Sequence, residues 1–208
     1  MRLKSKLIIC LLLSGLLSSQ LALPVHARYI PEIILISRCA EDTDETKYYD
    51  VPLDNEMQDY IRETLDEFEV DVSNGLEIVL AMAHTESRFK TDVINGDCKG
   101  IMQVSEVHKE TLEELGIQDL YDPYDCFKAG VYYLKQGFDN AEELWDELDD
   151  CTLSKEDFIL NGALMSYNLG KYGARKKISE GIYSTSYVEK VRKAMSELEL
   201  RQEEEQDE

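Results

Sequence analysis

The sequence has few basic residues and few histidines. Its 208 residues include 22 Lys and Arg against 43 Asp and Glu, which gives a formal net charge of −21. Nucleic acids and anionic lipids are bound through basic surfaces, so we expect neither as a partner. The 3 histidines lack zinc-binding spacing, and the cysteines form no Cys-x-x-Cys pair. We therefore expect no metal site and no cofactor.

Long hydrophobic runs are also scarce, and the one long run lies at the N-terminus. Basic residues precede an apolar stretch from Leu7 to Leu17, and short side chains precede a candidate cleavage site after Ala27. This layout is typical of a secretory signal peptide, so we predict removal of residues 1–27 and export of the remainder. An uncleaved membrane anchor is the alternative, because residues 7–25 are nearly long enough to span a bilayer. The protein would then meet the membrane only through this segment.

Cysteine is used sparingly in the remainder of the chain. Removal of the signal peptide would leave Cys39, Cys98, Cys126 and Cys151. An even number of cysteines in an exported chain indicates up to two disulfide bonds, whose pairing the spacing does not fix. Buried free thiols are the alternative.

Alternating apolar and polar residues, the pattern of half-buried strands, are scarce. Residues 28–57 predict only a lead-in segment. Beyond it, apolar residues recur at helical spacing, as at Tyr60, Ile61 and Leu65. We predict a mainly α fold, built as a single compact helical domain, and a disordered acidic tail over residues 197–208.

Glu86 lies on the apolar stripe of one of the predicted helices. Val79, Met82 and Ala83 precede it by seven, four and three residues, which places all four on the same helix face. A carboxyl group on a buried stripe loses water, and a helix C-terminus disfavours negative charge, so both effects raise its pKa. Such a group can act as a general acid. On this helix alone, a structural glutamate remains the alternative.

A series of short motifs begins at Glu86. In chain order they are Glu86–Phe89, Gly100–Val104, Leu115–Ile117, Asp119–Pro123, Ala129–Leu134, Ala163–Gly170 and Tyr187–Val191. Their order and spacing resemble the lysozyme-like soluble lytic transglycosylase domain over residues 58–196. The resemblance implies a single lysozyme-like helical domain with a substrate cleft. It also implies an exported bacterial enzyme, extracellular or associated with the cell wall, whose partner is the peptidoglycan glycan strand.

The resemblance implies that Glu86 is the catalytic residue of a peptidoglycan lytic transglycosylase. Glu86 would protonate the oxygen of the β-1,4 bond between N-acetylmuramic acid and N-acetylglucosamine. The same carboxylate would then deprotonate the muramoyl 6-hydroxyl, whose attack on the anomeric carbon closes a 1,6-anhydro ring. One protein carboxylate suffices for both steps because the substrate supplies the nucleophile.

The residues that follow Glu86 are implied to bind the substrate. Ser87 would support the site by hydrogen bonding. Gly100 would permit close backbone approach, and Met102 would give an apolar contact. Gln103 would form two polar contacts with sugar or acetamido groups. Met102 could instead belong to the core.

The remaining implied site residues lie toward the C-terminus. Tyr167 and Asn168 would face the glutamate across the cleft, and Tyr187 matches the aromatic residue of the family's closing motif, although it could simply anchor the last helix. The family's Tyr-Asn motif commonly continues Ala-Gly-x-Gly, whereas residues 169–173 read Leu-Gly-Lys-Tyr-Gly here. The acidic segment 139–157 is longer than the family's usual connection and would extend a helix or form a flap beside the cleft.

Two cysteines lie close to these motifs in the sequence. Cys98 belongs to the loop before the Gly-Ile-Met-Gln motif, and Cys126 stands where the family often has asparagine. A Cys98–Cys126 disulfide would clamp that loop onto the helix after Asp122–Pro123. It would leave Cys39–Cys151 as the second pair.

Two other functions remain open. A hydrolytic muramidase of the same superfamily would need a placed water and a second carboxylate, for which Asp92 and Asp97 are the candidates. A non-catalytic wall-binding or assembly protein would keep the groove but would have no need of Glu86. An acidic domain binds an anionic wall weakly on its own, so a cell-envelope secretion or conjugation apparatus is a further candidate partner.

Overall fold

The computed structural model describes residues 48–148 and 151–205, with the side chains of 199–205 left aside. The predicted signal peptide and most of the lead-in segment lie outside the described residues. So do residues 206–208 of the predicted tail. Within the described ranges, every helix is too short or too polar to cross a bilayer.

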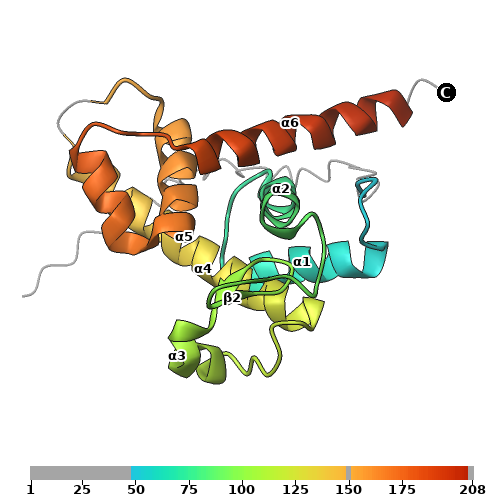
Figure 1. Ribbon diagram of the computed structural model, residues 1–208. Helices are drawn as coiled ribbons and strands as arrows, with labels where there is room; N and C mark the ends of the chain where they lie inside the picture. Colours follow the sequence, from blue (N-terminus) through green and yellow to red (C-terminus); the bar gives the residue numbers. More distant parts are fainter. Residues whose placement is uncertain (1–47, 149–150, 206–208) are drawn as a thin grey trace, which may run out of the picture. The chain divides into compact units, whose positions relative to one another are not determined.

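Over residues 48–148 and 151–205, six α-helices, one short 3-10 helix and a small three-stranded antiparallel sheet make up one compact unit (Figure 1). In chain order the elements are α1 (Asn55–Glu67), α2 (Gly75–Ser87), β1 (Ile94–Asn95), β2 (Cys98–Lys99), β3 (Val104–Ser105), η1 (Glu106–His108), α3 (Lys109–Glu114), α4 (Pro123–Asp146), α5 (Lys155–Ser179) and α6 (Ser186–Glu205). The predicted mainly α fold in a single domain is confirmed.

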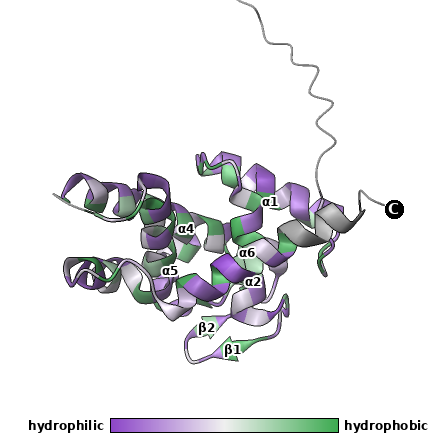
Figure 2. Ribbon diagram, turned by 90° about the horizontal axis from the view of Figure 1, so that it is seen from above, coloured by the Kyte–Doolittle hydropathy of each residue, from purple (hydrophilic) through white to green (hydrophobic). Residues whose placement is uncertain are grey.

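Helix α2 forms the centre of the core. Its residues Ile78–Ala83 are all buried, with α6 on one side and α1 on the other. A helix that is apolar around its whole circumference must be covered on all sides. By contrast, α4 and α5 carry both hydrophobic and hydrophilic residues (Figure 2). The core therefore holds α2 firmly and fixes the position of the last turn, which carries Glu86.

Helices α4 and α5 pack closely because glycines lie where they cross. A Cβ atom at Gly137 of α4 would lie 2.6 Å from the carbonyl oxygen of Ala163, and one at Gly162 of α5 would lie 2.8 Å from the Cβ of Ala141. Both contacts are too short for any side chain, so glycine at these positions lets the two backbones approach. This contact positions the part of α5 that continues to Tyr167.

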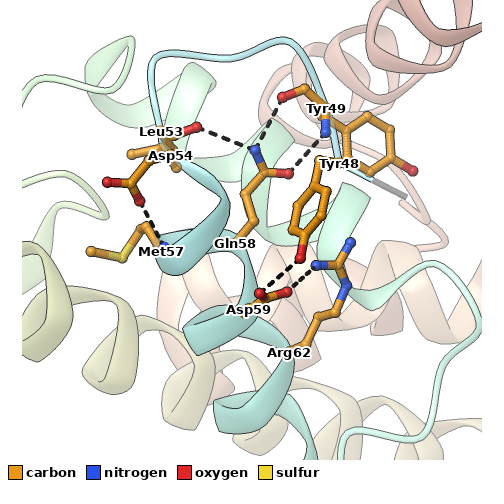
Figure 3. Close-up of polar contacts among 8 residues, drawn as sticks. All are labelled: Tyr48, Tyr49, Leu53, Asp54, Met57, Gln58, Asp59 and Arg62. Carbon is orange, nitrogen blue, oxygen red and sulfur yellow. Dashed lines mark hydrogen bonds and ion pairs between the residues drawn. The ribbon is translucent and has the colours of Figure 1, made fainter. Parts of the chain in front are cut away.

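The chain before α1 is tied to that helix by one buried side chain (Figure 3). Gln58 accepts a hydrogen bond from the backbone N–H of Tyr49 at 2.9 Å and donates to the carbonyl oxygens of Tyr49 at 3.0 Å and Leu53 at 3.2 Å. A buried amide with such partners is well satisfied. Residues 48–57, which we expected to belong to the lead-in, therefore pack as part of the domain.

Two acidic segments are helical in part among the described residues. The segment 139–157 extends α4 to Asp146, and Glu143 and Glu147 form ion pairs with Arg175 of α5. Helix α6 continues to Glu205 and so enters the segment for which we expected disorder. Glutamate and leucine are good helix formers, so charge alone does not stop a helix that the core already supports.

Candidate active site

Glu86 lies in the last turn of α2 and is partly exposed. Burial raises the pKa of its carboxyl group, and the nearby Tyr187 hydroxyl opposes the rise. Helix α2 ends immediately afterwards, since Arg88 and Phe89 have positive φ angles of 56° and 62°. The carboxyl group is therefore held at a fixed helix end, where the helix dipole also favours its protonated form.

Tyr187 at the start of α6 lies close enough to Glu86 for its hydroxyl to lower the pKa of that carboxyl group. It is only 9% exposed, and its hydroxyl has no well-aligned hydrogen-bond partner among the described residues. Burial raises its pKa well above the usual value, and the charge of Glu86 adds to the effect. The hydroxyl thus stays protonated beside the carboxyl group, close enough to influence it but without ideal hydrogen-bond geometry. The start of α6 therefore lies beside Glu86.

Ser87 joins the end of α2 to residues 100–104, which we call the motif loop. Its buried Oγ lies 2.9 Å from the carbonyl oxygen of Ile101 and 3.2 Å from that of Ala83, and one hydroxyl proton serves both contacts. The hydrogen bond to Ile101 is the contact through which Ser87 would support the site, a role that stays a prediction. Ser87 sets the position of the motif loop relative to Glu86.

Gly100 begins the motif loop with a φ angle of +73°. A Cβ atom at this position would overlap the carbonyl oxygen of Leu120 and would lie 2.8 Å from the Sγ of Cys126. Glycine at this position permits a close approach to Leu120 and Cys126 of the protein itself, and the expected contact with a sugar stays a prediction.

Met102 is completely buried. Its side chain fills the space above Gly130 of α4, where a Cβ atom would lie 2.9 Å from the Met102 methyl group. The expected apolar contact between this side chain and a sugar is therefore wrong, because the motif turns Met102 into the core.

Gln103 uses its side-chain amide within the loop. Its Nε2 donates to the carbonyl oxygens of Gly100 at 2.9 Å and Val93 at 3.1 Å, and its φ angle is +50°. Both amide protons are thus engaged by the backbone. In this arrangement a sugar could contact the Oε1 atom alone, which differs from the expected pair of contacts.

Tyr167 on α5 also contacts the motif loop, which Ser87 of α2 binds as well. Its hydroxyl donates to the carbonyl oxygen of Met102 at 2.7 Å. Although part of the residue is exposed, this hydroxyl is buried, and burial followed by the charge of Glu86 raises its pKa well above the usual value. Asn168 is exposed, and the helix is interrupted at Gly170, whose φ and ψ are 73° and 162°.

The expected Cys98–Cys126 disulfide is not present, since Cys98, Cys126 and Cys151 are free thiols among the described residues. Cys39, and with it the expected Cys39–Cys151 pair, lies outside the described residues. The Cys126 sulfur is directed at the loop backbone, 3.4 Å from the N–H nitrogen of Met102. The pKa of Cys98 is raised by burial and then by the charges of Glu86 and Asp97. Cys98 therefore lies within range of both carboxyl groups. The Cys98 and Cys126 sulfurs therefore lie in different surroundings.

Sequence reasoning missed the surroundings of these two cysteines. For Cys126 the helical spacing to Phe127 and Val131 indicates a buried position, but it does not show that the sulfur meets the loop backbone. For Cys98 the short strand β2 turns alternate side chains to opposite faces. This alternation places Cys98 on the other face from Lys99, which forms an ion pair with Glu106.

A hollow with a volume of about 660 Å³ lies elsewhere. It is lined by Asn74 and Ile78 near the start of α2 and by Arg192 of α6. Glu86 lies at the opposite end of α2, so this hollow is not the candidate catalytic site. Within the described ranges, no group of three or more His, Cys, Asp or Glu residues could hold a metal ion.

A helical domain with a buried central helix, a desolvated carboxyl group at its end and two tyrosine hydroxyls near that group has the features of a lysozyme-like fold. In comparison with known families, residues 60–184 match the family described as Transglycosylase SLT domain. This match covers more than half of the 208 residues, and the chain belongs to that family. Membership implies a lytic transglycosylase family and a peptidoglycan substrate. Comparisons with curated proteins and with solved structures gave no significant match.

Proposed function

We propose that the protein is an exported peptidoglycan lytic transglycosylase in which Glu86 acts first as general acid and then as general base. The observation that carries the proposal is the position of Glu86. Its carboxyl group is desolvated at the end of a buried helix, and its pKa is raised. A carboxyl group that keeps its proton toward neutral pH is what glycosidic bond cleavage requires.

In the first step, protonated Glu86 donates its proton to the glycosidic oxygen between N-acetylmuramic acid and N-acetylglucosamine. The bond from this oxygen to the anomeric carbon breaks, and N-acetylglucosamine leaves with a free hydroxyl group. Positive charge develops on the muramoyl ring while Glu86 becomes a carboxylate. In the second step, this carboxylate accepts the proton of the muramoyl 6-hydroxyl, whose oxygen bonds to the anomeric carbon. Glu86 is then protonated again, and the product is a 1,6-anhydro sugar.

The buried Tyr187 hydroxyl has a role in this cycle. It is protonated and lacks a well-aligned partner, so it can donate a hydrogen bond to Glu86 when Glu86 becomes negative. A hydrogen bond to a charged group is stronger than one to a neutral group. Tyr187 thus favours the intermediate in which Glu86 has given up its proton.

Substrate contacts are assigned to groups that the fold leaves accessible. The exposed side chain of Asn168 and the Oε1 atom of Gln103 are the polar candidates. Ser87, Gly100 and the Met102 side chain support the loop from within. Because Asn168 is exposed and supports no part of the loop, its mutation should affect KM without affecting the free energy of unfolding.

Hydrolysis is the alternative outcome for the cleaved bond. The charges of both Glu86 and Asp97 raise the pKa of Cys98, so a second carboxylate lies in the same neighbourhood. Asp97 is exposed and would have to place a water molecule opposite Glu86. The chemical form of the product separates the two reactions.

The test is digestion of purified peptidoglycan by the mature protein, with the products identified by mass spectrometry. Muropeptides ending in 1,6-anhydro-muramic acid support the proposal, and reducing ends support hydrolysis. Glu86→Gln should abolish release. Glu77→Gln, in the first turn of the same helix and at the end far from Glu86, should retain it. Binding without release by the unaltered protein would show a non-catalytic wall-binding protein.

Export and wall association are part of the proposal. They rest on the signal-peptide pattern of residues 1–27 and on the peptidoglycan substrate class. Sequencing the N-terminus of the protein recovered from the culture medium or the wall fraction would test both. A secretion or conjugation apparatus as partner remains a prediction from the acidic surface alone.

A further inference from the structure

The peptide group between Ile101 and Met102 is held at both of its polar ends. Its carbonyl oxygen accepts a hydrogen bond from Ser87 Oγ at 2.9 Å, and its N–H donates to Cys126 Sγ at 3.4 Å. Ser87, Ile101, Met102 and Cys126 are all buried. One end of this peptide group is thus bound by the neighbour of Glu86, and the other is bound by α4.

The surroundings of the Cys126 sulfur suit a thiol that accepts one hydrogen bond and donates another. Its Sγ also lies 3.7 Å from the carbonyl oxygen of Lys99, within reach of a weak S–H hydrogen bond. Burial raises the pKa of Cys126 to about 11, although the N–H groups of Met102, Val104 and Ile101 oppose the rise. At neutral pH the group is a thiol, so it can donate to Lys99 while its sulfur accepts from Met102.

The same loop is bound from a third direction. The carbonyl oxygen of Met102 accepts the Tyr167 hydroxyl at 2.7 Å, so consecutive peptide groups are held by α2, α4 and α5. A peptide group fixed at one end can rotate about the chain, whereas a group fixed at both ends cannot. Cys126 therefore determines the orientation in which Ile101 presents its carbonyl oxygen to Ser87.

We propose that Cys126 is a positioning residue of the active site, which acts through the Ile101–Met102 peptide group and Ser87 on the placement of Glu86 against the motif loop. This inference rests on the proposed function, because Cys126 can position an active site only if Glu86 is its catalytic residue. It also accounts for a free thiol at this position in place of a disulfide. Pairing with Cys98 would remove the proton that Cys126 donates and would turn its sulfur away from Met102.

A packing role for Cys126 would leave a different signature. If the sulfur only filled space, Ala and Val would be tolerated at least as well as Ser, because a buried hydroxyl costs free energy unless it is hydrogen-bonded. A hydrogen-bonding role predicts the opposite order, since a serine hydroxyl can both donate and accept. Comparison of Cys126→Ser with Cys126→Ala and Cys126→Val therefore separates the two roles.

The experiment measures release of muropeptides by the mature protein and these variants. Cys126→Ala and Cys126→Val should lower kcat/KM about tenfold, mainly through kcat, which is the size expected for one lost hydrogen bond. Cys126→Ser should recover most of the activity. Cys151→Ala, at a free cysteine that is not part of the motif loop, is the matched control and should equal the unaltered protein. Equal activity of the Ser, Ala and Val variants, or lower activity of the Ser variant, would overturn the inference.

Amide hydrogen exchange gives a readout that does not depend on catalysis. The Met102 N–H should be protected in the unaltered protein and in Cys126→Ser, and its exchange should accelerate about tenfold in Cys126→Ala. Unchanged protection in the alanine variant would reject the positioning role whatever the activity. If the unaltered protein releases no muropeptides but Met102 shows this pattern, the proposed function fails while the loop geometry stands.

Discussion

The hydroxyl of Tyr187 lies beside the carboxyl group of Glu86, and no described side chain gives that hydroxyl a well-aligned hydrogen bond. A buried polar group without a partner lowers stability, so its presence at this position calls for a functional reason. We expect Tyr187→Phe to lower kcat about tenfold or more, because the Glu86 carboxylate formed during the reaction loses its donor. The free energy of unfolding should stay the same or rise.

The pH profile of Tyr187→Phe gives an independent check. The Tyr187 hydroxyl opposes the rise in the pKa of Glu86, so its removal raises that pKa further. Activity that needs protonated Glu86 should therefore persist to higher pH in the variant. Measurement of kcat between mildly acidic and mildly alkaline pH tests this shift. A falling limb that moves to lower pH, or does not move, would contradict the assigned contact.

Glu86 should also make the stability of the domain depend on pH. Burial raises its pKa in the folded state above that in the unfolded state. Between these two pKa values the folded state binds more protons, so the contribution of Glu86 to stability is full below the unfolded pKa and is lost as pH rises. Glu86→Gln should therefore gain stability over the unaltered protein as pH rises above about 4.3, the ordinary pKa of glutamate. Urea denaturation of the two proteins at several pH values measures the difference.

Tyr167 should contribute to the free energy of unfolding through its hydrogen bond to Met102. In Tyr167→Phe, the buried carbonyl oxygen of Met102 loses its donor, which should cost about 1–3 kcal/mol in the free energy of unfolding. The exposed Tyr172, on the same helix beyond Gly170, provides the control. Tyr172→Phe should change the free energy by less than about 0.5 kcal/mol. Equal values for the two variants in urea denaturation would show that the bond to Met102 contributes little.

The fold and the place of Glu86 at the end of a buried helix could be predicted because both depend on local periodicity. Apolar residues at helical spacing report which face is buried, and Val79 to Ala83 put Glu86 at the edge of that face. Other residues of the motifs could not be assigned in this way. Motif membership places Met102 and Gln103 in one loop, but the direction of each side chain depends on backbone angles and on contacts with α4.

Long-range pairing was the least predictable feature. The sequence puts Cys98 and Cys126 near the same loop, and proximity alone favours a disulfide. The structure separates their surroundings. Cys98 of β2 lies within range of the charges of Glu86 and Asp97, while α4 directs Cys126 at the Met102 N–H. Such a distinction depends on the orientation of two elements that lie far apart in the sequence.

Glycine at position 100 should be indispensable for folding. A Cβ atom there would overlap the Leu120 carbonyl oxygen, and the φ angle of +73° also disfavours any side chain. Gly100→Ala should lower the free energy of unfolding by about 4 kcal/mol or more, beyond the ordinary range for single substitutions. Gly181 has a similar φ of +75° but open space around it. Gly181→Ala should therefore cost only the backbone strain, about 1–2 kcal/mol. Similar losses for the two variants in urea denaturation would contradict the close approach to Leu120.

Thiol labelling of the native protein should distinguish the three described cysteines. Cys126 is buried with a pKa raised to about 11, so almost none of it is thiolate and an alkylating reagent reaches it only after local unfolding. Cys98 and Cys151 are partly exposed and should react first, with Cys98 slowed by its raised pKa. Mass spectrometry of tryptic peptides after brief alkylation, without reductant, gives the order directly. Labelling of Cys126 at the rate of Cys151 would show that the loop opens readily and that Cys126 does not hold it, whereas a Cys98–Cys126 linked peptide would restore the disulfide that the sequence suggested.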